Sequence, residues 1–380
     1  MHLDSAIEIL NENSIDGAIF FRPQELVMLA NHYPHWNGSV LVSTRHGQHI
    51  LFTPDLEPAP IEVASGIEVV SYPWATAAND PWLGLLSRIK NMLGEGASVA
   101  INTSLSQPAP SSNAGEGSII PISFFLAFKD NFKLIDINVS LNELLSVKTP
   151  KQIEQIKLTH TIALPAISEF FKVKAGCTDA ELAARIEAEV AKQSGKSGTS
   201  YSRAWATIQS GPDTKNACRY NKTGSRIIQN DDWVFLEMSV CVNGYWLDLT
   251  RTTIAGSPTQ QQTIHFDLVY GAIQAALELA KPGVSLKSLY QASMQIFKDA
   301  GLSHCFPHGL GHGTGFSYHD PSLAINDSNN TLLRPGHVIT IEPALYGDEI
   351  NGGVRIEENI VITDDGFEYL SKPQTKIQES

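Results

Sequence analysis

Apolar residues alternate with other residues along residues 233–242, and this spacing predicts a β-strand. The residues that would share its apolar face are Val234, Leu236, Met238, Val240 and Val242. Asn243 and Gly244 come next, and both tolerate positive φ, so they predict a two-residue turn. A second strand-like stretch then runs to Thr253. The pattern therefore predicts a β-hairpin over residues 232–253.

The opposite face of this hairpin carries two carboxylates. With a two-residue turn, Glu237 pairs with Thr250. Ser239 then pairs with Asp248, and the two acidic side chains become diagonal neighbours on one face. Two carboxylates in an apolar setting repel each other unless a proton or a cation lies between them. A solvent-exposed polar face is the alternative explanation for the pair.

In the first 146 residues, strand-like runs alternate with helical periodicity. Predicted strands cover residues 17–21, 39–44, 49–53, 67–72, 98–101 and 133–137, and predicted helices cover residues 3–12 and 81–93. Pro81 suits the first turn of its helix because its missing N–H costs nothing there. Residues 107–118 are rich in Pro, Ser, Asn and Gly and predict a loop. The alternation predicts an α/β domain over residues 1–146.

A domain boundary is predicted near residues 146–150, where Thr149 can cap a helix that has Pro150 at its first position. Thr178 and Glu181 form a capping box for the next helix. Predicted helices cover residues 151–174, 178–193, 259–280 and 285–300, and further strands cover residues 204–208, 338–342 and 354–363. This order predicts helices packed on one face of an antiparallel sheet, an α+β fold, over residues 147–380. It also suggests a twofold internal duplication.

Composition narrows the class of protein. The chain has 380 residues, 42% of them hydrophobic and 18% charged, which is typical of a globular protein of two domains. A formal net charge of −13 and a pI near 5.4 argue against a nucleic-acid or anionic-membrane partner. We read no signal peptide at the N-terminus and no membrane span. The four cysteines lack CxxC spacing, which fits reduced thiols in the cytoplasm.

Three histidines, His308, His312 and His319, lie within twelve residues and alternate with glycines. Glycine lets the backbone approach a ligand closely, and neutral imidazole is the commonest side-chain metal ligand. A flexible polar loop is the alternative explanation.

Two further acidic residues, Glu342 and Glu357, lie in β-branched strands, where an unpaired charge is costly. An ion pair with Arg355 would be a structural explanation, but one arginine meets at most two of the four carboxylates well. Four carboxylates and one imidazole suit two divalent cations, with Mn, Co or Zn preferred. Two such cations hold a hydroxide and polarise a carbonyl, which predicts a hydrolase. His319 would then be free for acid–base chemistry.

Four motifs follow one another in the second half of the chain. They are Gly-Tyr-Trp-Leu-Asp-Leu-Thr-Arg-Thr (244–252), His-Gly-Leu-Gly-His-Gly-Thr-Gly (308–315) with His319-Asp320 after it, Ile-Glu-Pro-Ala-Leu-Tyr (341–346) and Gly-Val-Arg-Ile-Glu-Glu-Asn (353–359). Together they resemble the pita-bread metallopeptidases, and the chain length resembles the branch of prolidase, aminopeptidase P and creatinase. The resemblance implies a C-terminal pita-bread domain preceded by a creatinase-type α/β domain.

Carried to this sequence, the resemblance implies that Asp248 and Glu357 bridge two metal ions. His312 and Glu342 would complete one site, and Glu237 would hold the other ion alone. Mn is the expected metal, with Co, Zn or Fe as alternatives.

The resemblance also implies catalytic and substrate-binding residues. Glu342 would take a proton from a metal-bound hydroxide. His308 and His319 match imidazoles that steady the scissile amide and the tetrahedral intermediate. Arg355 matches an arginine expected to bind a substrate carboxylate or to support Glu357.

Two positions depart from the family's pattern. The family's peptidases have Asp where this chain has Glu237, so the second metal could be weak, shifted or absent. The family usually has a His about eight residues after the Ser210-Gly211 turn, where this chain has Cys218 and Arg219. Arg219 would suit a substrate carboxylate, and Cys218 would be a filler.

The sequence thus predicts a metal-dependent hydrolase that resembles Xaa-Pro peptidases and cleaves the amide after the first residue of a short peptide. One alternative is a creatinase-like or ectoine-hydrolase-like C–N hydrolase of a small non-peptide substrate. Another is a catalytically silent pita-bread module that binds a partner. The resemblance also implies a homodimer, in which His35 and Trp36 would form a loop that reaches the other subunit's active site.

Overall fold

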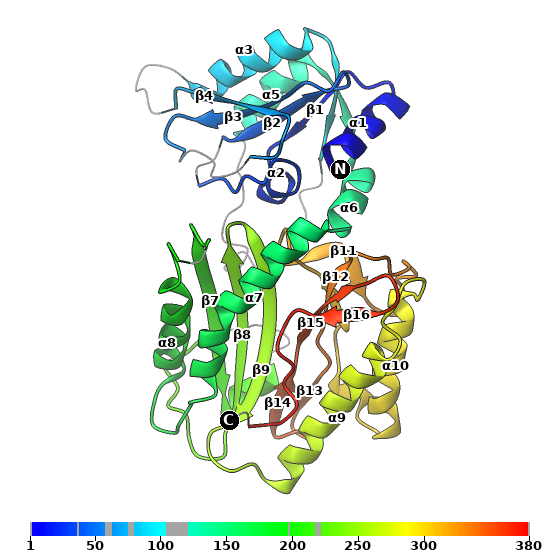
Figure 1. Cartoon of the computed structure of the whole chain (residues 1–380). Coiled ribbons are helices and arrows are strands. Elements are labelled where there is room, and N and C mark those ends of the chain that lie inside the picture. The colour runs from blue at the N-terminus through cyan, green and yellow to red at the C-terminus, as the bar shows by residue number, and fades with distance from the viewer. Residues whose placement is uncertain are drawn as a thin grey trace. The chain divides into compact units, whose positions relative to one another are not determined.

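The computed structural model describes residues 2–35, 38–57, 63–74, 80–103, 121–196, 198–216 and 222–378. They form two compact units, and the chain passes from the first to the second between Leu145 and Ser146 (Figure 1). The predicted loop over residues 107–118 lies outside the described residues.

The first unit is built on a mixed six-stranded sheet with the order β4-β3-β2-β1-β5-β6. Strands β1, β2 and β3 pair antiparallel, whereas β4 runs parallel to β3 and β5 and β6 continue parallel from β1. Its strands are β1 (Gly17–Phe20), β2 (Val40–Thr44), β3 (His49–Pro54), β4 (Ile67–Tyr72), β5 (Ser98–Ile101) and β6 (Lys133–Asp136). All six predicted strands are therefore present.

Helices of the first unit are α1 (His2–Glu12), α2 (Pro23–Ala30), α3 (Pro81–Leu93), α5 (Ile122–Asn131) and α6 (Asn138–Ser146). Side chains from α3 and α5 pack with the sheet in one apolar cluster. The sequence predicted α1 and α3 but not α2, α5 or α6. In α2 the run from Leu26 to Ala30 is buried throughout, so it shows no amphipathic period.

In the second unit, the predicted hairpin is confirmed. Strands β7 (Ser202–Ser210), β8 (Trp233–Val242) and β9 (Tyr245–Ile254) form an antiparallel sheet. Glu237 pairs with Thr250, as predicted from the two-residue turn. The turn residues Asn243 and Gly244 have φ values of 52° and 88°, the left-handed region that the turn requires.

One face of this sheet is covered by helices α7 (Pro150–Phe170) and α8 (Asp179–Ala191), which share an apolar cluster with β7, β8 and β9 (Figure 1). The predicted N-cap at Thr149 and the predicted capping box at Thr178 are both present, and Thr149 also forms a capping box with Gln152. Helix α7 ends at Phe170, four residues before the predicted end. Because α7 and α8 cover only one face, the Glu237 face of β8 points away from them.

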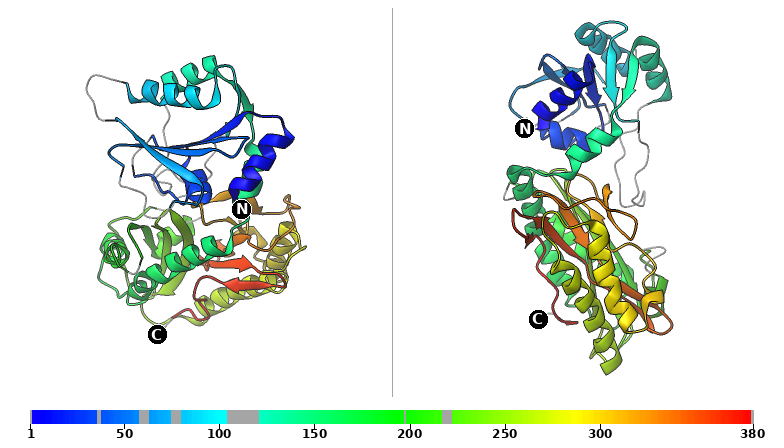
Figure 2. Two further views of the ribbon diagram at one scale, coloured as in Figure 1. Left: turned by 45° about the horizontal axis from the view of Figure 1, so that its top comes forward. Right: turned by 90° about the vertical axis from the view of Figure 1, so that its right-hand side faces the viewer.

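A second set of strands follows helices α9 (Gln260–Leu277) and α10 (Leu286–Asp299), which lie side by side in Figure 2. The strands are β10 (Gly311–Gly313), β11 (Asp320–Ile325), β12 (Val338–Ile341), β13 (Ala344–Gly347), β14 (Gly352–Arg355), β15 (Glu358–Ile362) and β16 (Phe367–Tyr369). Two short 3-10 turns, Gly211–Asn216 and Ser303–Cys305, complete the elements. Helices α9 and α10 share one apolar cluster with these strands. The predicted α+β class is confirmed for this unit.

One strand prediction is wrong. Residues 354–363 were expected to form a single strand, but β14 pairs with β13 whereas β15 pairs with β12. The break falls at Ile356 and Glu357. At this point the buried guanidinium of Arg251 donates a hydrogen bond to the Glu357 carbonyl (2.5 Å), so this backbone group bonds to a side chain instead of a neighbouring strand. Along the described residues, no helix is long and apolar enough to cross a membrane.

Candidate metal centre

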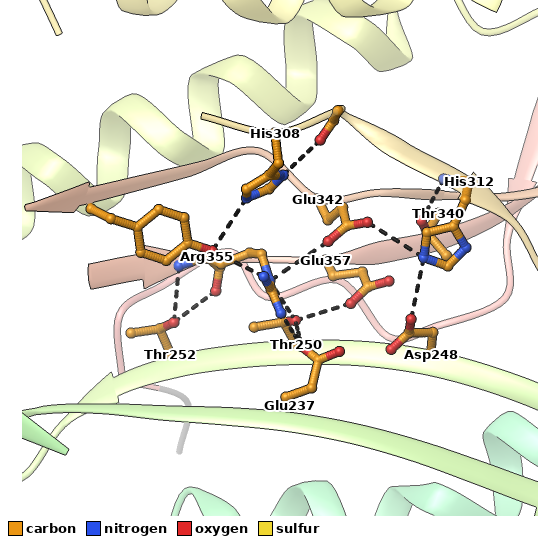
Figure 3. A network of polar contacts seen from close by, with 12 residues as sticks. Glu237, Asp248, Thr250, Thr252, His308, His312, Thr340, Glu342, Arg355 and Glu357 are labelled. Carbon is orange, nitrogen blue, oxygen red and sulfur yellow. Dashed lines mark hydrogen bonds and ion pairs between the residues drawn. The ribbon is translucent and has the colours of Figure 1, made fainter. Parts of the chain in front are cut away.

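A cluster of acidic side chains and histidines lies between the β8–β9 hairpin and the strands that follow α10 (Figure 3). Strand pairing places Glu237 and Asp248 on the hairpin face that points toward it. Both side chains are buried, with 4% and 2% of their surface exposed, and Glu357 is fully buried. The alternative of a solvent-exposed polar face is therefore wrong. Buried carboxylates this close together need compensating positive charge.

His312 approaches two of these carboxylates. Its Nε2 lies 3.3 Å from the Asp248 carboxylate and 3.4 Å from that of Glu342. Its Nδ1–H donates to the Gly313 carbonyl (2.9 Å), which turns Nε2 toward the acids. Burial alone would lower the pKa of His312, but the Asp248 and Glu342 carboxylates raise it to about 9. The ring is thus held in the orientation that a metal ligand requires.

Backbone contacts hold the other acids in place. Glu342 follows β12, and its N–H donates to the Leu310 carbonyl (2.7 Å). Glu357 lies at the break between β14 and β15, where its N–H donates to the Thr250 carbonyl (3.2 Å). Burial raises the pKa of the Glu357 carboxyl well above its ordinary value, and the neighbouring acids raise it further. Residues from four separate segments thus converge on one buried volume.

Three atoms of this cluster have no hydrogen-bond partner within the described chain: Asp248 Oδ1, Glu357 Oε1 and His312 Nε2. Leaving a buried polar atom unpaired costs about 1–3 kcal/mol, and more when it is charged. Ligand atoms of His312, Glu342 and Glu357 lie within 4.8 Å of one another. Carboxylate oxygens with one imidazole are donors that hard divalent cations accept. Asp248, His312, Glu342 and Glu357 therefore fit a divalent metal ion.

Arg355 brings a fixed positive charge to the cluster. Its guanidinium forms an ion pair with Glu237 and lies 3.7 Å from Glu342. It also donates to Thr250 Oγ1 (2.9 Å) and to the Tyr346 hydroxyl (2.9 Å). The sequence predicted that one arginine meets at most two of the four acids well, and these contacts agree.

His308 and His319 lie on different sides of the cluster. His308 Nδ1 donates to the Gly309 carbonyl (2.7 Å), and its Nε2 lies 3.3 Å from the Tyr346 hydroxyl. Burial and the charge of Arg355 lower the pKa of His308 to about 4, so the ring is neutral. His319 Nε2 lies 3.2 Å from the Asp248 carboxylate, and burial and His312 lower its pKa.

Of the remaining predicted site residues, the structure describes only His35. His35 lies in the first unit, where its N–H donates to the Glu57 carboxylate (2.8 Å) and its side chain is 40% exposed. Trp36 and Arg219 fall outside the described residues, as does Cys218.

Several residues that contact the cluster received no role from the sequence. Tyr318 donates to Glu237 (2.7 Å), and Thr250 donates to the same carboxylate (2.7 Å). Asn359 donates to the Asp248 carbonyl (2.6 Å). Thr250 and Arg251 belong to the Thr-Arg-Thr motif, and Tyr318 directly precedes His319. Their places in or beside these motifs are a signal that sequence reasoning could have used. Their contacts could not be predicted, because they join segments far apart in the chain.

Comparison with known proteins identifies the class. The model of metallopeptidase family M24 matches residues 154–364, more than half of the chain. The chain belongs to this family, and it is a hydrolase of the metallopeptidase class whose activity depends on divalent metal ions. The pita-bread fold and the two-domain organisation expected from the resemblance agree with that membership.

Individual relatives extend over the whole chain. The Xaa-Pro dipeptidase of Pyrococcus furiosus is 27% identical over 377 residues, which is 99% of each chain. An uncharacterized peptidase of Staphylococcus haemolyticus is 34% identical over 239 residues, 62% of this chain and 65% of that one. The crystal structure of the prolidase from Pyrococcus horikoshii OT3 superposes with a TM-score of 0.81, at 26% identity and 98% coverage of both chains.

Proposed function

We propose that the protein is a metal-dependent peptidase of the Xaa-Pro type, which cleaves the amide after the first residue of a short peptide. The observation that carries the proposal is the set of unpartnered ligand atoms on Asp248, His312 and Glu357, in a chain of family M24. Similarity to Xaa-Pro dipeptidases over the full length supports the substrate class. Family membership favours an enzyme over the silent binding module.

Asp248, His312, Glu342 and Glu357 would hold the metal ion. Mn is the metal we propose, because three carboxylates and one imidazole form an oxygen-rich donor set. When bound, such an ion lowers the pKa of water and polarises a peptide carbonyl. The buried acids would hold the ion and keep bulk water away from it.

The surrounding side chains would accept a proton from the attacking water and orient the peptide. Glu342 would accept the proton of the attacking water, since burial raises the pKa of its carboxyl toward the range of a general base. His319 is neutral and close to Asp248, and its ring would steady the reacting carbonyl or the leaving nitrogen. His308, Tyr346 and Arg355 form one hydrogen-bonded chain that would orient the peptide. Arg219 and the loop containing His35 and Trp36 remain substrate-binding candidates.

Replacement of the metal ligands tests the proposal. Asp248→Asn and His312→Ala should lower the hydrolysis of Xaa-Pro dipeptides by about a thousandfold or more, because the metal is lost with them. His304→Ala is the matched control, since His304 is 61% exposed and pairs with Glu349 outside the cluster. Circular dichroism should show the native fold in all three variants. Activity retained in either ligand variant would contradict the proposal.

A second candidate is the hydrolysis of a C–N bond in a small non-peptide substrate, as in creatinase-like or ectoine-hydrolase-like enzymes. Glu237 favours this candidate, because the family's peptidases have Asp at this position. Here the glutamate forms an ion pair with Arg355. Turnover of Xaa-Pro dipeptides should be compared with that of cyclic and guanidino amides under added Mn. Activity on the second group alone would select this candidate.

We also propose that the protein is a homodimer of the cytoplasm. The described cysteines Cys177 and Cys305 are free thiols, as expected in a reducing compartment. The dimer follows only from the family resemblance, and sedimentation analysis of the purified chain tests it.

A further inference from the structure

Glu237 differs from the other acids of the centre because both of its carboxylate oxygens already have partners. The Tyr318 hydroxyl donates to Oε1 (2.7 Å). Oε2 accepts from Thr250 (2.7 Å) and from the Arg355 guanidinium. Asp248 and Glu357, by contrast, each keep one oxygen without a hydrogen-bond partner among the described residues. Each acid that would bridge two ions thus keeps an oxygen without a hydrogen bond, whereas both oxygens of the acid that would hold the second ion alone are hydrogen-bonded.

Arg355 is fixed in this arrangement. Its side chain is 7% exposed, and the same guanidinium that pairs with Glu237 also donates to Thr250 and Tyr346. Its charge centre also lies 4.9 Å from the ring of Phe235. Arg355 therefore supplies to Glu237 the positive charge that a second cation would otherwise supply. Moving it away would break several buried hydrogen bonds at once.

Distance alone would permit a second ion. Oxygens of Glu237, Asp248 and Glu357 lie within 4.8 Å of one another. A cation on Oε2 would have to displace Thr250 or Arg355, because that oxygen already accepts two hydrogen bonds, and a cation on Oε1 would share that oxygen with the Tyr318 hydroxyl. It would also lie beside the guanidinium, a like charge in a buried setting. Hydrogen bonding and charge both oppose the second ion.

We propose that this protein binds a single divalent cation tightly, through Asp248, His312, Glu342 and Glu357, and that the Glu237–Arg355 ion pair takes the place of the second cation. This inference rests on the proposed function, because it assumes the metal-dependent centre described above. The extra methylene of Glu237 is the physical cause. It extends the carboxylate by about 1.5 Å relative to Asp, one carbon–carbon bond, and so brings it to Arg355 and Tyr318.

Metal stoichiometry tests the proposal without reference to activity. The full-length protein and its variants are stripped with a chelator, titrated with Mn²⁺ in a calorimeter, dialysed and analysed for bound manganese. Wild type should retain one equivalent, with the electron paramagnetic resonance spectrum of an isolated Mn²⁺ ion. Glu237→Gln should also retain one equivalent. Glu237→Asp should bind a second equivalent about tenfold more tightly than wild type does, because the shorter carboxylate is released from Arg355.

A matched control and three outcomes make the result decisive. Glu154→Asp removes the same methylene from an exposed glutamate, and its stoichiometry should equal that of wild type. Two tightly bound equivalents in wild type, with an exchange-coupled Mn²⁺ spectrum, would overturn the single-cation proposal and leave the peptidase proposal standing. Loss of manganese in Glu237→Gln would also overturn it. Wild type that retains no divalent metal would overturn both proposals.

Discussion

At the scale of single residues, Arg251 positions the metal centre without reaching it. Its guanidinium is almost completely buried and donates to the Glu357 carbonyl, to the Glu358 carboxylate (3.2 Å) and to the Lys372 carbonyl (2.7 Å). Glu358 thus points away from the centre, while the adjacent Glu357 points into it. One arginine thus fixes which of two neighbouring glutamates points into the proposed metal centre.

Truncation of this side chain should be costly. Arg251→Ala leaves the buried Glu358 carboxylate without its cationic partner, so the free energy of unfolding should fall by about 3–5 kcal/mol. Urea denaturation measures the change. Arg185→Ala is the control, since its ion pair with Glu169 is 44% exposed on the arginine side and should contribute at most about 1 kcal/mol. Similar losses in both variants would show that burial of Arg251 is not the cause.

At the scale of elements, the β8–β9 hairpin sets the register that places Glu237 and Asp248 in one cluster. A slip by one residue between β8 and β9 would place Glu237 and Asp248 on opposite faces of the sheet. Asn243 enforces the turn in two ways: it adopts positive φ, and its side chain bonds to the segment before β7. Its Oδ1 accepts from Ser200 N (3.0 Å), and its Nδ2 donates to the Gly198 carbonyl (2.9 Å).

Two substitutions separate these contributions. Asn243→Gly keeps the left-handed backbone and loses only the side-chain hydrogen bonds, so unfolding should become easier by about 1 kcal/mol. Asn243→Ala also strains the backbone, which adds about 1–2 kcal/mol. Thermal and urea unfolding of both variants give the difference. An alanine variant as stable as the glycine variant would mean that the backbone conformation is not what holds the register.

At the scale of the whole molecule, both units bury histidines that must stay neutral. Burial and His35 lower the pKa of His32 in the first unit to about 4. Burial and nearby cationic side chains lower the pKa values of His160 and His337 in the second unit to about 3. In the unfolded chain these residues titrate near 6.5. Their contribution to stability is therefore complete above pH 6.5 and is lost as the pH falls from there toward 4 and 3.

Acid sensitivity should follow from these histidines. Between pH 7.5 and 5.5, each buried histidine should cost about 1 kcal/mol of unfolding free energy, because protonation favours the unfolded chain. His160→Leu should reduce the pH dependence by that amount, whereas His46→Ala, at an exposed turn position, should leave it unchanged. Chelated protein is used so that metal loss does not contribute. An unchanged pH dependence in His160→Leu would contradict the assignment.

Much of this architecture was predictable because it depends on local chemistry. The helix cap at Thr149, the capping box at Thr178, the turn at Asn243-Gly244 and the register of β8 with β9 are properties of short segments, and all were predicted. Helix α2 was missed because burial on several sides leaves no amphipathic period, and α5 was missed because apolar residues such as Ile122 and Leu126 also lie on its exposed side. The break at Glu357 was missed because its cause, Arg251, lies more than a hundred residues earlier.

The sequence by itself determined the family, the α+β class and the set of acids and histidines at the centre, because motif spacing and strand alternation record them directly. Only the tertiary structure decided what each acid does. Asp248 and Glu357 keep open oxygens, Glu358 turns to Arg251, and Glu237 pairs with Arg355. These differences arise from contacts between segments distant in the chain, which the pattern along one segment does not contain.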